Sequence, residues 1–209
     1  KVFLLCNPHN PAGRVWTADE LTKLNDICMK HGVKVISDEI HCELIMKGHT
    51  YIPFASLSDE SLHNSITLNS PTKAFNIAGL QIANVVACDE DVRHKIDRAI
   101  NINEICDVNP FGVIATMAAY NEGGEWLDSL NEYLYDNYLE LRRFFSERMP
   151  NIGVTHLEGT YLVWADIRST GMTSDALTEK LLKEGHVMVN SGTMYGKTAG
   201  EGFLRINIA

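Results

Sequence analysis

The chain opens with an apolar run, a turn rich in proline, a capped helix and a second apolar run. The first run, Val2 to Cys6, stops at residues 7–13, where two prolines and a glycine block helix and strand continuation. Thr17 and Glu20 have the spacing of a capping box, and apolar residues then recur at helical spacing. A second buried strand is predicted at 33–37. This order predicts a βαβ unit, and therefore a parallel sheet covered on both faces.

Later patterns extend this α/β prediction. We expect buried strands at 65–68 and 83–88, helices at 89–101, 111–120 and 125–149, short strands at 154–157, 161–166, 187–190 and 203–208, and a helix at 173–184. Residues 1–128 are predicted to form part of a large domain with a mainly parallel sheet and flanking helices. Residues 129–209 are predicted to form a long connecting helix and a smaller, truncated α+β domain.

Composition excludes several classes of protein. The 209 residues are 45% hydrophobic and carry a net charge of -9, without a basic patch for nucleic acid or anionic lipid. Apolar runs are far shorter than the roughly 20 residues that span a bilayer, so no membrane partner is expected. The five cysteines are Cys6, Cys28, Cys42, Cys88 and Cys106. Their odd number and wide spacing argue against a disulfide framework and favour a cytoplasmic protein.

Polar residues cluster after three of the predicted strands. In an open parallel sheet, ligands bind outside the carboxyl ends of the strands. The candidates there are Asn7 and Asn10 after the first strand, Asp38, Glu39 and His41 after the second, and Asn69, Ser70, Thr72 and Lys73 after the third. Amide, carboxylate, hydroxyl and amine groups together suit an anionic, aromatic ligand with a carbonyl group.

Each of the two charged candidates has a structural alternative. Asp38 alone more often caps a turn, although a carboxylate at a strand end also suits a cationic ring nitrogen. Lys73 alone is more often a solvated surface charge. Its apolar surroundings, from Ala74 to Leu80, instead favour a partly buried amine that is suited to imine chemistry.

A metal site is a weaker interpretation of the segment from Asp38 to Glu43. Asp38, His41, Cys42 and Glu43 are all ligand types, but an extended segment would direct Asp38 and His41 to opposite sides. No metal is therefore predicted. The sequence also lacks an HExxH pair, a GxSxG elbow and a GxGxxG loop, which argues against the corresponding metalloprotease, serine hydrolase and dinucleotide sites.

Four ordered segments resemble one known family. They are NPHNPAG at 7–13, SDEIH at 37–41, SPTKAFNIAGL at 70–80 and FLRIN at 203–207. In order and spacing they are similar to the fold-type-I pyridoxal-phosphate (PLP) enzymes of the class I/II aminotransferase family. Within that family, SDEIH and the phrase from Lys73 to Gly79 look most like the MalY/PatB-type cystathionine β-lyases, which cleave carbon-sulfur bonds.

The resemblance implies a role for each matching position. Lys73 would bind PLP covalently and shuttle the substrate Cα proton, and Asp38 would keep the pyridine nitrogen protonated. Arg205 would bind the substrate α-carboxylate as a bidentate fork. The remaining implied cofactor contacts are Asn10 and His41 to the ring oxygen, and Ser70 and Thr72 to the phosphate.

The sequence also departs from the family pattern. Gln81 stands where many aminotransferases have a phosphate-binding arginine. The family's N-terminal half, which carries a glycine-rich phosphate-binding turn, is missing. We therefore expect this chain to be a fragment of a longer protein, to bind PLP weakly or not at all by itself, and to be inactive alone. The resemblance further implies a homodimer in the full-length protein.

The predicted activity is a PLP-dependent carbon-sulfur β-lyase. It would convert cystathionine, cysteine or a related small sulfur amino acid to a thiol, pyruvate and ammonia. The first alternative is a class I/II aminotransferase, which uses the same core residues. The second alternative is a regulatory or interaction module that keeps the fold without catalysis.

Overall fold

The structure is a computed structural model that describes residues 1–105 and 107–209. The remaining cysteine, Cys106, lies outside the described residues. The described chain divides into two compact units. The first comprises residues 1–8, 15–45 and 49–129, and the second comprises residues 9–14, 46–48 and 130–209.

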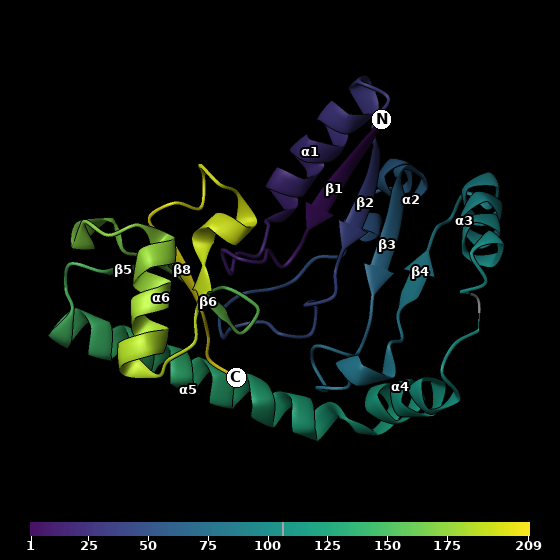
Figure 1. Ribbon diagram of the computed structural model, residues 1–209. Coiled ribbons are helices and arrows are strands. Elements are labelled where there is room, and N and C mark those ends of the chain that lie inside the picture. Colours follow the sequence, from purple (N-terminus) through teal and green to yellow (C-terminus); the bar gives the residue numbers. More distant parts are fainter. Residues whose placement is uncertain (106) are drawn as a thin grey trace. The chain divides into compact units, whose positions relative to one another are not determined.

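The first unit contains a four-stranded sheet (Figure 1). Strands β1 (Val2–Cys6), β2 (Lys34–Asp38) and β3 (Ser65–Asn69) run parallel, and β4 (Asn84–Val86) pairs with β3 in the antiparallel direction. The sheet order is β1-β2-β3-β4. The predicted α/β class with a mainly parallel sheet is confirmed.

Helix α1 (Ala18–Lys30) confirms the predicted crossover between β1 and β2. The Thr17 hydroxyl accepts from the Glu20 backbone amide, and the Glu20 carboxylate accepts from the Thr17 amide, which forms the predicted capping box. Leu21 and Cys28 on the inner face of the helix pack with Leu5 of β1 and Val35 of β2, in a core that also contains Phe54. Burial of these apolar side chains fixes the helix on the sheet.

Three further helices belong to this unit. Helix α3 (Glu90–Ile102) and helix α4 (Pro110–Glu122) lie where the sequence predicts helices, capped by the side chains of Asp89 and Asn109. The short helix α2 (Asp59–Asn64) was not predicted. The Ser58 and Ser61 side chains cap each other's backbone amides at the start of this helix. The helix is too short to show helical periodicity in the sequence.

The prediction that β1 and β4 are buried strands is wrong for the described chain. Val2 and Leu4 of β1 are 62% and 67% exposed, and Val86 of β4 is 55% exposed. These two strands form the edges of the sheet, so each has a neighbouring strand on one side only. Strand β4 is also shorter than the predicted 83–88 range.

The second unit has its own antiparallel sheet, in the order β5-β6-β8-β7. Its strands are β5 (Gly153–Val154), β6 (Leu162–Asp166), β7 (Asn190–Ser191) and β8 (Phe203–Asn207). Helix α6 (Ser174–Gly185) and most of helix α5 (Gly124–Arg148) complete the unit. The predicted α+β class is confirmed for this unit. Strands β5 and β7 are shorter than predicted, and β7 begins near the end of its predicted range.

Tyr138 of α5 anchors the core of the second unit. Its side chain is 1% exposed, and its hydroxyl donates to the Thr155 carbonyl and accepts from the Leu157 amide. The buried phenol therefore satisfies two backbone groups of a segment that was predicted to be a longer strand. Leu157 itself is fully buried.

Four short 3-10 segments, at 54–56, 78–80, 168–170 and 192–195, complete the described elements. Among the described residues, none of the helices has the length and apolar character needed to cross a bilayer.

Replacing Leu21 by alanine tests the packing of α1 on the sheet. Because Leu21 is fully buried, the substitution should lower the free energy of unfolding by about 2–5 kcal/mol. The matched control is Lys23→Ala on the exposed face of the same helix, which should change that free energy by about 0.5 kcal/mol or less. Chemical denaturation followed by circular dichroism measures both values. Equal effects of the two substitutions would contradict this packing.

Candidate active site

The carboxyl ends of the three parallel strands are aligned in the first unit. Asp38, the last residue of β2, pairs in register with Cys6 of β1 and Leu68 of β3. The alignment continues beyond the strands, because the Asn7 amide donates to the Asp38 carbonyl at 3.0 Å and the Glu39 amide donates to the Leu68 carbonyl at 2.8 Å. The polar residues that follow β1, β2 and β3 therefore gather at one edge of the sheet.

Asn7 has a structural role at this edge. Its side chain is fully buried, donates to the Ile52 carbonyl at 3.2 Å and accepts from the Trp16 amide at 3.1 Å. These bonds fix the segment that leaves β1. Both polar atoms of the amide already have protein partners, so Asn7 contributes to the site through the backbone it holds.

The neighbouring carboxylates Asp38 and Glu39 are used differently. Glu39 is 3% exposed, and its carboxylate accepts from the Ser37 hydroxyl, the Phe54 amide and the Tyr51 hydroxyl. Burial, and secondly the negative charge of Glu39, raise the pKa of Tyr51. Glu39 is therefore a structural carboxylate with its lone pairs occupied.

Asp38 is half-buried and keeps part of its bonding capacity. Its Oδ1 accepts from the Ile40 amide at 3.2 Å, which is the turn-capping bond of the structural alternative. Its Oδ2 has no hydrogen bond or ion pair with any described residue. The structural and functional interpretations are thus compatible, because one oxygen holds the turn and the other can accept from a protonated ligand.

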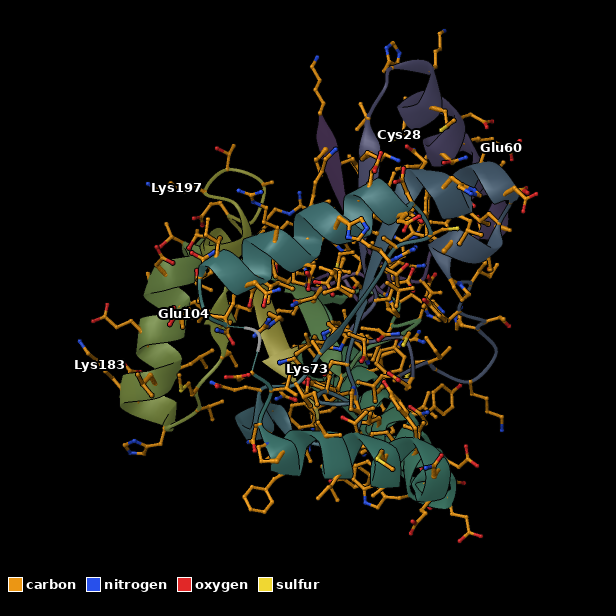
Figure 2. All side chains as sticks on the ribbon, turned by 90° about the vertical axis from the view of Figure 1, so that its right-hand side faces the viewer. Cys28, Glu60, Lys73, Glu104, Lys183 and Lys197 are labelled. Atoms are coloured by element: carbon orange, nitrogen blue, oxygen red, sulfur yellow. The ribbon has the colours of Figure 1, made fainter. Side chains whose placement is uncertain are left out.

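Lys73 lies in a tight loop that follows β3. The Phe75 amide donates to the Pro71 carbonyl at 2.9 Å, and the Ile77 amide donates to the Thr72 carbonyl at 3.1 Å. Within this loop Lys73 is half-buried, as predicted, and makes no hydrogen bond or ion pair with a described residue. Figure 2 labels its position. A primary amine that is held on a closed loop without a carboxylate partner is suited to covalent chemistry.

Ser70 and Thr72 stabilise the same loop. The buried Ser70 hydroxyl donates toward the Ile82 carbonyl and the Thr72 hydroxyl, and it accepts from the Thr72 amide at 3.2 Å. Its single hydrogen is therefore already engaged within the protein. The Ser70 and Thr72 hydroxyls are in contact, and Ser70 has a single hydrogen for its contacts with Ile82 and Thr72. Both predicted phosphate ligands are thus engaged within the loop.

His41 lies in the turn that follows β2 and is 3% exposed. The sequence argument that residues 38–43 are extended is wrong, because residues 40–43 form this turn. Among the described residues, no group of three or more potential ligand side chains is placed to hold a metal ion. The metal interpretation of this segment therefore has no geometric support.

The sequence analysis missed a group of interacting titratable side chains that includes Cys42, Glu43 and Tyr120. Burial raises the pKa of Glu43, and burial followed by the Glu43 charge raises the pKa of Cys42. Burial, and secondly Glu43, raise the pKa of Tyr120 to about 12. Tyr120 comes from α4, so its proximity depends on tertiary packing that no local motif reveals.

In the second unit, Arg205 lies on β8 between β6 and β7. Its guanidinium donates from Nη1 to Asn10 Oδ1 and from Nη2 to Asn190 Oδ1, each at 3.1 Å. It also stacks over the Tyr195 ring, with 4.9 Å between the guanidinium carbon and the ring centroid. Asn190 and Tyr195 were not predicted, because both follow α6 in a segment without a recognisable motif.

The arginine retains binding capacity in this arrangement. Arg205 Nε is buried and has no hydrogen-bond partner among the described residues. The contact with Asn10 also orients that amide, since its Oδ1 accepts from Arg205. A groove of about 330 Å³ lies in this unit, lined by His9, Asn10, Pro11, Ala12, Trp164, Tyr195, Ala199 and Gly200.

Two of the predicted residues are thus brought together in the second unit, Asn10 and Arg205. In the first unit, Asp38 ends β2 and the Ser70–Lys73 loop follows the adjacent parallel strand β3.

A match over the whole chain decides the family assignment. Residues 1–209 match the model of the family described as aminotransferase class I and II. The chain belongs to this family.

Three relatives illustrate the similarity. The chain is 43% identical over 206 residues to cystathionine beta-lyase PatB of Bacillus subtilis (strain 168), covering 99% of this chain and 53% of PatB. A PLP-bound protein of Clostridium difficile 630, provisionally named an aminotransferase, is 48% identical with a TM-score of 0.97, covering 100% of this chain and 54% of that one. Cystalysin of Treponema denticola, solved with PLP, is 35% identical with a TM-score of 0.97, at 100% and 53% coverage. The chain thus spans about half the length of these relatives.

His9, beside Asn10 in the groove, provides a test of this geometry. Burial, and secondly the Arg14 charge, hold the pKa of His9 below its ordinary value of about 6.5. Arg14→Gln should raise that pKa part of the way, since burial remains, whereas Arg14→Lys should leave it depressed. Proton NMR titration of the imidazole measures the shift.

The sign of the stability effect follows from the same shift. The unfolded chain binds the His9 proton more readily than the folded chain, so stability falls as the pH drops through and below about 6.5. A His9 pKa at or above its ordinary value would contradict the burial described here.

Proposed function

We propose that the full-length protein containing this chain is a PLP-dependent carbon-sulfur β-lyase. Its substrate would be cystathionine, cysteine or a related sulfur amino acid, and its products a thiol, pyruvate and ammonia. The observation that carries the proposal is the placement of two groups on adjacent parallel strands. Lys73, an amine without a hydrogen bond or ion pair to the described residues, lies in the loop after β3, and Asp38, a partly available carboxylate, ends β2. The similarity to a relative named cystathionine beta-lyase favours lyase chemistry.

The residues present fit PLP by the chemistry of their donor groups. When bound, PLP supplies an electron sink that stabilises negative charge at the substrate Cα. Asp38 Oδ2 provides the acceptor that keeps a pyridine nitrogen protonated, while Oδ1 stays on the Ile40 amide and fixes the carboxylate. The Ser70 and Thr72 hydroxyls would donate to the phosphate only if they turned away from the Ile82 carbonyl and from each other.

Lys73 has two roles in the proposed reaction. Its amine would hold the cofactor covalently, and the same amine would take the proton from the substrate Cα. The loop bonds around Lys73 restrict the position of its backbone, so that the amine can reach both groups from one place. Loss of the thiol from Cβ then uses the electron pair that deprotonation leaves at Cα.

Arg205 binds the substrate α-carboxylate in this proposal. The two amide oxygens of Asn10 and Asn190 hold its Nη groups, and the Tyr195 ring supports the guanidinium plane. A guanidinium that is already held in place loses less conformational entropy on binding a carboxylate than a mobile one does.

His41 and the quaternary structure complete the proposal. We assign His41 to the cofactor's surroundings on the ring-oxygen side, as the family resemblance implies. We also propose a homodimer. The four described cysteines form no disulfide with one another, which is compatible with a reducing compartment, and we propose the cytoplasm.

An aminotransferase is the second candidate, and one observation favours it. The structural relative at 48% identity is provisionally named an aminotransferase. Transamination would use the same amine, carboxylate and arginine, but without expelling a thiol from the substrate. The two activities therefore differ in their products and not in the residues described here.

The products of the full-length protein distinguish the two activities. Given cystathionine and no keto acid, the protein should release pyruvate, detected by coupled lactate dehydrogenase. Pyridoxamine phosphate that accumulates without pyruvate would favour transamination. Borohydride reduction should fix the cofactor on the peptide containing Lys73, and Lys73→Ala should abolish both this adduct and pyruvate release. An adduct on another lysine would overturn the proposal.

Asp38→Asn tests the carboxylate. The variant keeps an oxygen for the Ile40 amide, so the turn should be preserved while the negative charge is lost. The kcat for pyruvate release should fall on the order of 100-fold or more. Asp26→Asn, on the exposed face of α1, is the matched control and should keep wild-type activity. An active Asp38→Asn variant would exclude the proposed role of this charge.

A further inference from the structure

A second cluster of reactive groups lies at the amino-terminal edge of the first unit's sheet. A cavity of about 410 Å³ is lined there by Met29, Lys34, Asp59, Glu60, His63, Asn64 and Asp89. Lys34 begins β2, whereas Asp38 ends it, so this cavity lies at the opposite edge from the candidate active site. Figure 2 labels Glu60 of the cavity and Lys73 well apart. The proposed lyase reaction uses none of these residues.

His63 is held in one tautomer by its backbone contact. Its Nδ1 lies 2.8 Å from the Asp59 carbonyl oxygen. A carbonyl oxygen only accepts hydrogen bonds, so Nδ1 carries the hydrogen and Nε2 of the neutral ring presents a lone pair. The sulfur of Cys88 lies 3.6 Å from that Nε2. The thiol therefore donates to the imidazole, which is the arrangement of a nucleophile, a base and an orienting group.

Cys88 differs from the other described cysteines. It is exposed, whereas Cys28 is buried and Cys42 half-buried, and burial raises the pKa of both thiols. The Cys6 thiol donates to the Pro8 carbonyl, which is not a base that can take its proton. Of the described thiols, Cys88 thus combines exposure with a proton acceptor.

The charges around the cavity select among electrophiles. Asp59, Glu60 and Asp89 contribute three negative charges, against one positive charge from Lys34, which lies 4.0 Å from Asp89, and one from Arg93, which donates to the Cys88 carbonyl. The Lys34 ammonium also donates to the His63 carbonyl at 2.7 Å. The local potential is therefore negative, and it attracts cationic reagents and repels anionic ones.

We propose that Cys88 and His63 form a thiol-exchange site that takes small cationic disulfides. The Cys88 thiol gives its proton to His63 Nε2, and the sulfur attacks one sulfur atom of the disulfide. A bond forms between Cys88 and that sulfur as the original S–S bond breaks. The departing thiolate then takes the proton from His63, so that one disulfide is consumed and one thiol is released.

The test uses the full-length protein and two disulfides of opposite charge, the cystamine dication and the 3,3'-dithiodipropionate dianion, each in limiting amount. Peptide mass mapping should find the first mixed disulfide on Cys88, ahead of every other cysteine, including the other four of this chain. The rate of each disulfide with the protein is divided by its rate with a small reference thiol. At low salt, this corrected rate should be at least about tenfold higher for cystamine than for the dianion. The wild-type protein alone provides this comparison.

Variants separate the base from the charge. His63→Gln should slow modification of Cys88 roughly tenfold or more. His94→Gln, an exposed histidine on α3, is the matched control and should leave the rate unchanged. Glu60→Gln should reduce the preference for cystamine while keeping the His63 dependence. Cys88→Ser should abolish the first adduct.

Three results would overturn the proposal. One is a first adduct on another cysteine, and a second is equal corrected rates for the two disulfides. The third is a folded His63→Gln protein that reacts at the wild-type rate. None of these outcomes depends on lyase activity, so the failure of this proposal is distinguishable from the failure of the proposed function.

Discussion

The parallel register of β1, β2 and β3 is the constraint on which the candidate site depends. Cys6, Asp38 and Leu68 lie side by side, and backbone hydrogen bonds extend this alignment to Asn7 and Glu39. Because the strands are parallel, every segment that leaves a strand end here starts from the same edge of the sheet. A shift of one residue in β2 would exchange the faces of Asp38 and Glu39.

That exchange would matter because the two adjacent carboxylates have opposite tasks. Glu39 is buried and saturated by Ser37, Tyr51 and Phe54, so it stabilises the fold. One oxygen of Asp38 accepts from the Ile40 amide in the turn, and the other is available to a ligand. The same division appears in the second unit, where Arg205 is held through its two Nη groups while its Nε has no described partner. In each case structural contacts hold a charged group in place and leave part of its hydrogen-bonding capacity for a ligand.

Local patterns were sufficient to predict much of this fold. The capping box of α1, the strand positions of the first sheet and the helix after Asp89 all follow from short-range signals. The burial of β1 was overestimated, because an apolar strand does not reveal whether it lies at the centre or at the edge of a sheet. Asn190, Tyr195 and Tyr120 were missed for a related reason, since their contacts arise only when distant segments pack together. The predicted roles of Lys73, Asp38, Asn10 and Arg205 came mainly from family resemblance and stay predictions.

The central claim is that the Asp38 carboxylate keeps the cofactor's ring nitrogen protonated. Nitrogen-15 NMR of the full-length protein loaded with ring-labelled PLP reports the protonation state of that nitrogen directly. The account predicts the chemical shift of a protonated pyridine in the wild-type protein, and a shift toward the unprotonated form when Asp38 is replaced by asparagine. An unprotonated nitrogen in the wild-type protein, or a protonated one without the Asp38 charge, would contradict it.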